Sequence, residues 1–134
     1  MNLGTTPELK LLVAAAVIGL LHLVWGTAAG SGGDRDMTWL LGPRDDPRPV
    51  TGVAARLTRA YANFLETFPL YAAAVLAVVA AGKTGPLTLW GSWLYVVSRI
   101  IYTPVYAAGW PVVRTIVWAL SLVGIVLIIS AFFQ

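Results

Sequence analysis

The chain has 134 residues, of which 58% are hydrophobic and only 11% are charged, and its formal net charge is +3. Soluble domains carry about 25% charged residues, so this composition, with a mean hydropathy of +0.78, predicts a small integral membrane protein with a single domain over residues 1–134. The chain has no cysteine and only one histidine, His22, so no disulfide, cysteine nucleophile or metal site is expected within one subunit, and the dispersed basic residues do not indicate a nucleic-acid partner.

Apolar runs long enough to cross a bilayer occur four times along the chain. A hydrocarbon core requires about 20 apolar residues in helical form. The first run resembles a signal peptide in position, but its length favours a retained span. The sequence therefore predicts an all-α integral membrane protein, a bundle of four transmembrane helices in which the last three are antiparallel neighbours. The expected spans are 9–29, 53–81, 87–108 and 114–133.

The connection between the first two spans is rich in Gly, Pro, Asp and Arg, which favours a folded surface loop over another helix. Its turn "GPRDDPRP" (Gly42 to Pro49) either caps a polar site or is simply solvated. The positive-inside rule places the first and third loops in the cytoplasm and both termini outside. The basic residues that decide this are Arg35, Arg44, Arg48, Arg56 and Arg114 on one side, against Lys10 and Lys83 on the other.

Two of the expected spans carry polar residues at helical spacing, which puts each set on one face. Because a charge at the membrane centre costs about 2.5–3.5 kcal/mol on insertion scales, such faces are expected to meet inside the protein. The two sets are Arg56, Arg59, Asn63 and Glu66 on the second span, and Arg99, Tyr102 and Tyr106 on the third.

A structural explanation competes with a binding site. Arg56 and Arg59 could snorkel to the membrane boundary, Glu66 could pair with Arg59, and the tyrosines could be interface aromatics. Snorkelling does not, however, require Asn63 and Glu66 on the same stripe as the arginines.

The side chains of the two stripes suit a particular ligand chemistry. Arginines bind carboxylates bidentately, a glutamate accepts hydrogen bonds from an ammonium group, and phenol or guanidinium donors favour a thiolate over a thiol. Glutathione carries carboxylates, an amine and a thiol, so it fits this inventory.

The same residues carry a family resemblance. "RLTRAYANFLETFPLY" resembles the second-helix signature of the membrane-associated proteins in eicosanoid and glutathione metabolism (MAPEG), and "SRIIYTPVYAAGWPVVR" resembles the third-helix stretch of that family. The resemblance covers nearly the whole chain, and the chain resembles the bacterial members of the family. It implies a homotrimer in the bacterial inner membrane, with glutathione as cosubstrate bound between subunits near the cytoplasmic side and a lipophilic substrate entering from the lipid.

Carried over by position, the resemblance implies roles for individual residues. Glutathione would be bound by Arg56, Arg59, Asn63, Glu66, Arg99, Tyr102 and Tyr106. Arg114, helped by Tyr102, would stabilise the thiolate, although Arg114 follows Tyr106 one residue later than the family pattern has it. The implied function is a glutathione-dependent transferase or peroxidase. The alternatives are a non-catalytic trimeric lipid-binding or scaffolding protein and a small transporter or channel subunit.

Other residues have less specific interpretations. His22 is either a proton relay or substrate contact, or an inward-facing histidine bonded to a neighbouring helix. Gly19 and Gly26 are expected to permit close helix approach. Pro69 and Pro104 are expected to interrupt their helices. Membrane-interface anchoring accounts for the six tryptophans, Trp25, Trp39, Trp90, Trp93, Trp110 and Trp118.

Overall fold

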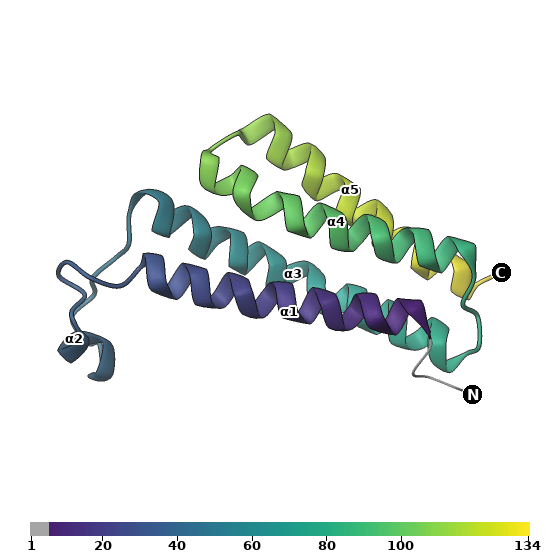
Figure 1. Cartoon of the computed structure of the whole chain (residues 1–134), viewed down its shortest axis with the longest axis horizontal. Helices are drawn as coiled ribbons and strands as arrows, with labels where there is room; N and C mark the ends of the chain where they lie inside the picture. The colour runs from purple at the N-terminus through teal and green to yellow at the C-terminus, as the bar shows by residue number, and fades with distance from the viewer. Residues whose placement is uncertain (1–5) are drawn as a thin grey trace.

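The computed structural model describes residues 6–134, and every regular element in that range is a helix. Four long helices alternate in direction along one axis, so the two ends of the described chain lie at the same end of the bundle (Figure 1). These helices are α1 (Pro7–Ala29), α3 (Gly52–Ala80), α4 (Pro86–Ala108) and α5 (Pro111–Phe132).

The first loop contains a short fifth helix, α2 (Met37–Leu41). The expectation of a loop without helix is therefore wrong for these five residues. The physical reason is a local cap, because the carboxylate of Asp36 accepts a hydrogen bond from the backbone N–H of Trp39 at 2.9 Å. Such a bond satisfies one of the donors that the first turn of a helix leaves free.

Proline and glycine set the ends of the long helices. Pro7, Pro86 and Pro111 each lie in the first turn of their helix, where a missing N–H leaves no helical bond unmade. Gly109 ends α4 in the left-handed conformation, with φ of +78°, which glycine adopts at low cost. The chain thus reverses within two residues, and α5 begins at Pro111 instead of the expected residue 114.

Pro69 and Pro104 do not interrupt their helices. Both lie inside a continuous helix, α3 in one case and α4 in the other. Each proline lacks the N–H that a helix interior normally uses, but neighbouring helices and side chains in a membrane bundle can satisfy the freed carbonyl. The prediction that Pro69 and Pro104 interrupt their helices is therefore wrong, because neither residue ends a helix.

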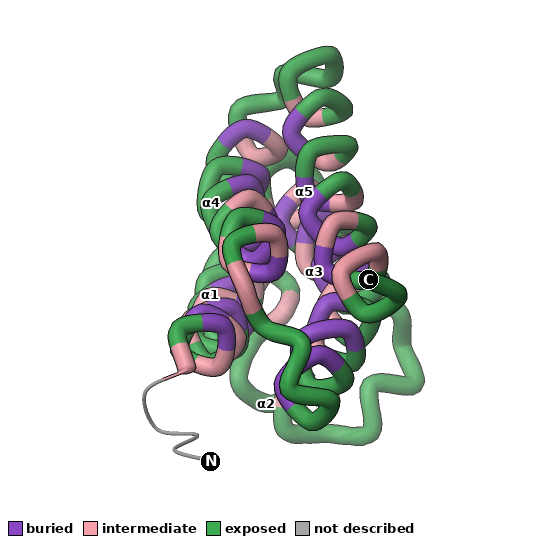
Figure 2. Tube along the Cα trace, turned by 90° about the vertical axis from the view of Figure 1, so that its right-hand side faces the viewer, coloured by how far each residue is buried: buried purple, intermediate pink, exposed green. Residues whose placement is uncertain are grey.

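The helices turn their buried residues toward one another and their exposed residues outward (Figure 2). Many of the exposed residues are large and apolar. Among the described residues α1, α3 and α5 are long and apolar enough to cross a membrane, whereas α4 is similar in length but is not identified as a span. Buried polar residues along α4 contribute to this difference. They are Thr88, Ser92, Ser98, Arg99 and Thr103.

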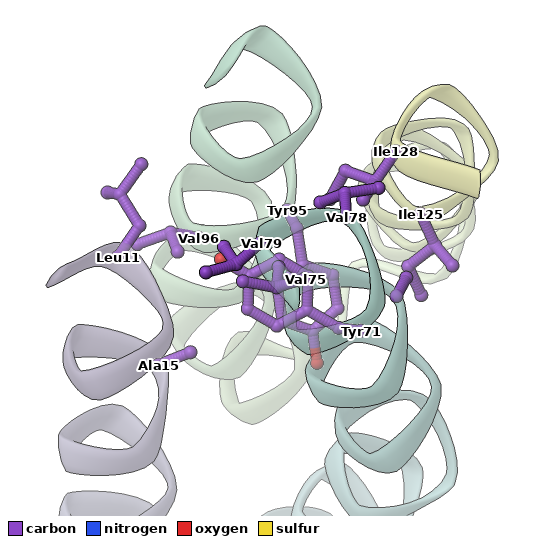
Figure 3. Close-up of a cluster of buried hydrophobic side chains, with 11 residues drawn as sticks. Leu11, Ala15, Tyr71, Val75, Val78, Val79, Tyr95, Val96, Ile125 and Ile128 are labelled. Atoms are coloured by element: carbon purple, nitrogen blue, oxygen red, sulfur yellow. The ribbon is translucent and has the colours of Figure 1, made fainter. Parts of the chain in front are cut away.

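The main apolar core lies between α1, α3, α4 and α5, away from the loop that holds α2 (Figure 3). At its centre the rings of Tyr71 and Tyr95 stack with centroids 4.1 Å apart. The hydroxyl of Tyr95 lies 3.0 Å from the hydroxyl of Thr67, so this end of the tyrosine is satisfied inside the bundle.

Glycines allow two close approaches between helices. A Cβ added to Gly124 would lie 2.6 Å from the carbonyl oxygen of Gly91, so α4 and α5 are in backbone contact there. A Cβ added to Gly19 would lie 2.5 Å from the ring of Phe64, which confirms the prediction of a close approach at this position. Gly26 has nothing within 4 Å in that direction, so the same prediction is wrong for Gly26 within one chain.

Candidate functional site

A polar cleft of about 480 Å³ opens between α3, α4 and α5. It lies toward the end of the bundle where α3 begins, α4 ends and α5 begins (Figure 1). The lining combines charged, amide and phenol groups with one indole, and consists of Arg59, Ala62, Asn63, Glu66, Tyr102, Tyr106, Arg114, Thr115 and Trp118.

The cleft brings together six of the eight residues expected at the site. Arg59, Asn63 and Glu66 reach it from one face of α3 because they are spaced by four and three residues. Tyr102 and Tyr106 reach it from α4 for the same reason. Arg114, in the first turn of α5, completes the group in spite of its displaced position in the sequence.

Tyr106 joins two arginines from different helices. Arg59 Nε donates a hydrogen bond to the Tyr106 hydroxyl at 3.2 Å, and the Arg114 guanidinium lies 4.6 Å from the centre of the same ring. A guanidinium over an aromatic ring is attracted by the negative charge of the ring face. Tyr106 therefore holds Arg59 and Arg114 at the same wall of the cleft.

Arg99 lies behind the cleft instead of in it. Its side chain is fully buried, and its Nη1 donates a hydrogen bond to the amide oxygen of Asn63 at 2.9 Å. Its guanidinium also lies 4.2 Å from the ring of Tyr102. Arg99 thus supports two residues of the lining, Asn63 and Tyr102, and does not itself contribute to the surface of the cleft.

Arg56 is also outside the main cleft. Its Nη1 donates a hydrogen bond at 2.9 Å to the backbone carbonyl of Ala107, in the last turn of α4. A cation near the carboxyl end of a helix interacts favourably with the unpaired carbonyls there. This contact ties the start of α3 to the end of α4. Arg56 does line a smaller neighbouring pocket that includes Arg59 and Arg114.

The charges of the cleft do not neutralise one another within the chain. Glu66 is exposed, and both ion pairs present in residues 6–134 belong to Arg48 in the first loop. The suggested pair between Arg59 and Glu66 is therefore absent from the described structure. The cleft presents two cations, from Arg59 and Arg114, and one carboxylate, from Glu66, to whatever enters it.

Trp118 is a lining residue that sequence reasoning placed elsewhere. It was expected to anchor the protein at the membrane interface, but it is half-buried and forms part of the cleft. Arg114 and Trp118 are spaced by four residues on α5, so they share one face. The spacing from Arg114 therefore predicts that Trp118 lies on the same side of α5 as the site.

His22 matches the structural interpretation of this residue. It is buried, its Nδ1 lies 3.4 Å from the hydroxyl of Thr103, and its ring meets that of Phe64 edge to face at 5.7 Å. It does not reach the main cleft.

The fold and the cleft define a small helical membrane protein with an apolar exterior and a charged site between helices. The family model described as "MAPEG family" matches residues 11–133, so the chain belongs to the MAPEG family. This confirms the resemblance found in the segments that form α3 and α4. This is a family of integral membrane proteins that generally use glutathione, and it includes glutathione transferases and peroxidases as well as non-catalytic members. No match to the chain is found among the curated proteins or among the solved structures.

Proposed function

We propose that the chain is a glutathione-dependent transferase or peroxidase that acts on a lipophilic electrophile from the membrane. In this proposal all four long helices, α4 included, cross the bacterial inner membrane as one domain, and the cleft faces the cytoplasm. The observation that carries the proposal is the meeting of Arg59, Asn63, Glu66, Tyr102, Tyr106 and Arg114 in one cleft.

The cleft suits the charge pattern of glutathione. Two carboxylates of this tripeptide can each be bound by a guanidinium, and Arg59 and Arg114 supply two guanidinium groups in the lining. The ammonium group of glutathione suits the carboxylate of Glu66, which has no ion-pair partner among the described residues. The amide of Asn63, fixed by Arg99, can orient the peptide backbone of the ligand.

Thiolate stabilisation falls to Arg114 and Tyr102. Both line the cleft, and both can direct a donor at the sulfur. A nearby cation favours the charged thiolate over the thiol and so raises the concentration of the nucleophile. The thiolate then attacks the electrophilic carbon of the substrate, the carbon–sulfur bond forms, and the leaving group departs with the electron pair. In a peroxidase reaction the thiolate attacks the terminal oxygen of a hydroperoxide instead, the O–O bond breaks, and the alkoxide leaves and takes up a proton. The sulfenic acid formed on glutathione then condenses with a second glutathione to give the disulfide and water.

The exposure of the cleft supports the trimer that the family resemblance implies. Arg59 and Glu66 are exposed in a single chain although both belong to a helix that is apolar enough to span a membrane. Lipid contact with these charges is unfavourable, and neighbouring copies of the chain would cover them. The cleft would then be closed by a second subunit, with the lipophilic substrate reaching it from the surrounding lipid.

Calorimetric titration of glutathione into the detergent-purified protein tests the binding step. We expect saturable binding that is weakened about tenfold or more in Arg59→Ala and Glu66→Ala, because each change removes a charged hydrogen-bond partner. Lys83→Ala is the control, since Lys83 lies beyond the end of α3 opposite the cleft and bonds to the carbonyl of Phe132. A well-folded protein that fails to bind millimolar glutathione would contradict the proposal.

The second candidate is a non-catalytic trimeric lipid-binding or scaffolding protein. It is favoured by the fact that several site residues bond to one another, Arg59 with Tyr106 and Arg99 with Asn63. Two measurements on Arg59→Ala, Glu66→Ala and Arg114→Ala separate the two candidates. Size-exclusion chromatography measures assembly, and an assay with glutathione and an electrophile measures turnover. Loss of assembly in the first two variants supports a structural network, whereas intact assembly with lost turnover in Arg114→Ala supports the enzyme.

A further inference from the structure

A second pocket, of about 220 Å³, lies between α1, α3 and the first loop. It shares none of its lining residues with the main cleft. Its lining combines apolar residues with two arginines of the loop, and the residues that matter to its chemistry are His22, Leu23, Arg35, Leu40, Arg44 and Tyr61. No aspartate or glutamate lines it.

The two arginines of this pocket keep their positive charge unpaired. Arg48, the third arginine of the loop, lies 3.3 Å from the carboxylate of Asp46 and 3.9 Å from that of Asp36. These are the two ion pairs of residues 6–134, so neither Arg35 nor Arg44 has a carboxylate within 4.0 Å in that range. The loop carries four aspartates and three arginines, but none of these aspartates lines this pocket.

Trp39 holds both arginines in place. The guanidinium of Arg35 lies 4.7 Å from the centre of the indole and that of Arg44 lies 5.5 Å from it. The indole is itself fixed, because its Nε1 donates a hydrogen bond at 2.7 Å to the carbonyl of Asp46. Arg35 Nε donates to the carbonyl of Arg48 at 2.5 Å, and Arg44 Nη2 donates to the carbonyl of Leu40 at 2.7 Å. The two charges are thus ordered before any ligand arrives.

The backbone of Arg44 is strained in support of this arrangement. Its φ is +58°, the one positive value at a described residue other than glycine. A side chain in this conformation costs free energy and persists only where surrounding contacts impose it. The strained turn directs the guanidinium of Arg44 back onto α2 and the pocket.

The surface next to the pocket is suited to acyl chains. On the outer face of α1, Leu20 and Val24 are exposed by 60% and 59%, and on α2 Met37 and Leu41 are exposed by 67% and 81%. The pocket therefore lies where apolar side chains meet a cluster of arginines, at the end of a helix long enough to cross a membrane.

We propose that this pocket binds the phosphate of an anionic phospholipid headgroup, with Arg35 and Arg44 as its ligands and the acyl chains along the outer face of α1. Guanidinium groups bind phosphate oxygens strongly, and the N–H groups of Arg35 and Arg44 that do not bond to the backbone are available to do so. The apolar wall at Leu23 and Leu40 accommodates the glycerol region of a lipid but gives no advantage to a free phosphate ion. This site is separate from the cleft and does not depend on the proposed function.

Native mass spectrometry of the full chain, released from nanodiscs of equimolar phosphatidylglycerol and phosphatidylcholine, tests the proposal. We expect phosphatidylglycerol to be retained preferentially. Because one basic residue near an anionic lipid surface is worth about 1 kcal/mol, each arginine removed should lower this preference about fivefold. The double variant Arg35→Gln with Arg44→Gln should abolish it, and Arg44→Gln, at an exposed position, should lower it without affecting folding.

Lys83→Gln removes the same charge at the opposite end of the bundle and is the matched control. Arg35→Lys keeps the charge but not the fork, and it should retain part of the preference. An unchanged preference in the folded Arg44→Gln variant and in the double variant overturns the proposal. The proposal is also overturned if inorganic phosphate displaces the lipid at the same concentration at which phosphate saturates the lipid-free protein. The pocket would then be a site for free anions.

Discussion

The Nη1 atom of Arg99 on α4 donates a hydrogen bond to the amide oxygen of Asn63 on α3 at 2.9 Å, inside the bundle and directly behind the cleft. This is the only hydrogen bond that the fully buried guanidinium makes to a described residue, since its Nε and Nη2 are without partners there. A buried cation with so few partners makes Asn63 important for stability, in addition to its proposed contact with the ligand.

Asn63→Leu is expected to destabilise the bundle more than Arg99→Met does. The first change leaves a buried charge with no hydrogen-bond partner, which costs about 2 kcal/mol. The second removes the charge together with its need for a partner, and apolar replacement of buried ionic groups is often neutral. Reversible unfolding in sodium dodecyl sulfate, followed by circular dichroism, measures both. The double variant should match Arg99→Met alone, and equal stability of wild type and Asn63→Leu would contradict this account.

The contact between α4 and α5 gives a second prediction. A Cβ at Gly124 would meet the carbonyl of Gly91 at 2.6 Å and the backbone nitrogen of Tyr95 at 2.9 Å, and backbone atoms cannot turn aside. Gly124→Ala should therefore lower the free energy of unfolding by about 1–3 kcal/mol, as other overpacking changes do.

Gly26→Ala is the matched control for this change, because it inserts the same methyl group into a helix where nothing lies within 4 Å. There the higher helix propensity of alanine acts alone, so stability should be unchanged or rise by up to about 1 kcal/mol. The same unfolding measurement in detergent compares the two. If both alanine variants lose stability equally, close packing at Gly124 is not what sets the distance between α4 and α5.

The sequence predicted which residues share a helical face but not how deep each lies. Spacings of three and four residues were enough to place Arg59, Asn63 and Glu66 on one stripe, and Tyr102 and Tyr106 on another. Arg99 belongs to the same stripe as the tyrosines, yet it is fully buried and contacts Asn63 and Phe64 of α3. Helical periodicity gives a direction around the axis, whereas depth depends on the neighbouring helices.

Close contacts between helices also cannot be predicted from the sequence alone. The chain has 13 glycines, and their identity does not distinguish Gly124, which meets another backbone, from Gly26, which meets nothing. Similarly, α2 depends on a cap by Asp36 and on the position of Trp39 among three arginines. These contacts cannot be predicted from the hydropathy of the sequence.

The proposed thiolate stabilisation predicts different effects for two lining residues. Arg114→Gln should lower the turnover of chlorodinitrobenzene with glutathione about a hundredfold, because loss of a positioned donor to an anion typically has this effect. It should also decrease the ultraviolet absorbance of the bound thiolate. Tyr102→Phe keeps the ring beside Arg99 and removes only the hydroxyl, so it should have the smaller effect if Arg114 is the activating group. Unchanged thiolate absorbance in Arg114→Gln, with a large loss in Tyr102→Phe, would assign activation to the tyrosine.

A buried carboxylate at the other end of the bundle gives the last prediction. Glu8, in the first turn of α1, is buried, and its Oε1 accepts a hydrogen bond at 2.6 Å from the hydroxyl of Thr88 at the start of α4. Its Oε2 has no partner among the described residues. Thr88 also accepts a bond from the backbone N–H of Gly85 at 2.8 Å, so one hydroxyl satisfies both the carboxylate and the end of a helix.

Thr88→Val keeps the shape of this side chain and removes its hydroxyl. It should lower the free energy of unfolding by about 1–3 kcal/mol, because a buried carboxylate oxygen and a backbone donor both lose their partner. Thr88→Ser retains the hydroxyl and is the matched control. Adding Glu8→Leu to Thr88→Val should restore part of the loss, since replacing both partners with apolar groups leaves fewer polar atoms unsatisfied. Unfolding in sodium dodecyl sulfate decides between these outcomes. If Thr88→Val is as stable as Thr88→Ser, the bond between α1 and α4 contributes nothing to the fold, and Glu8 must be satisfied in another way.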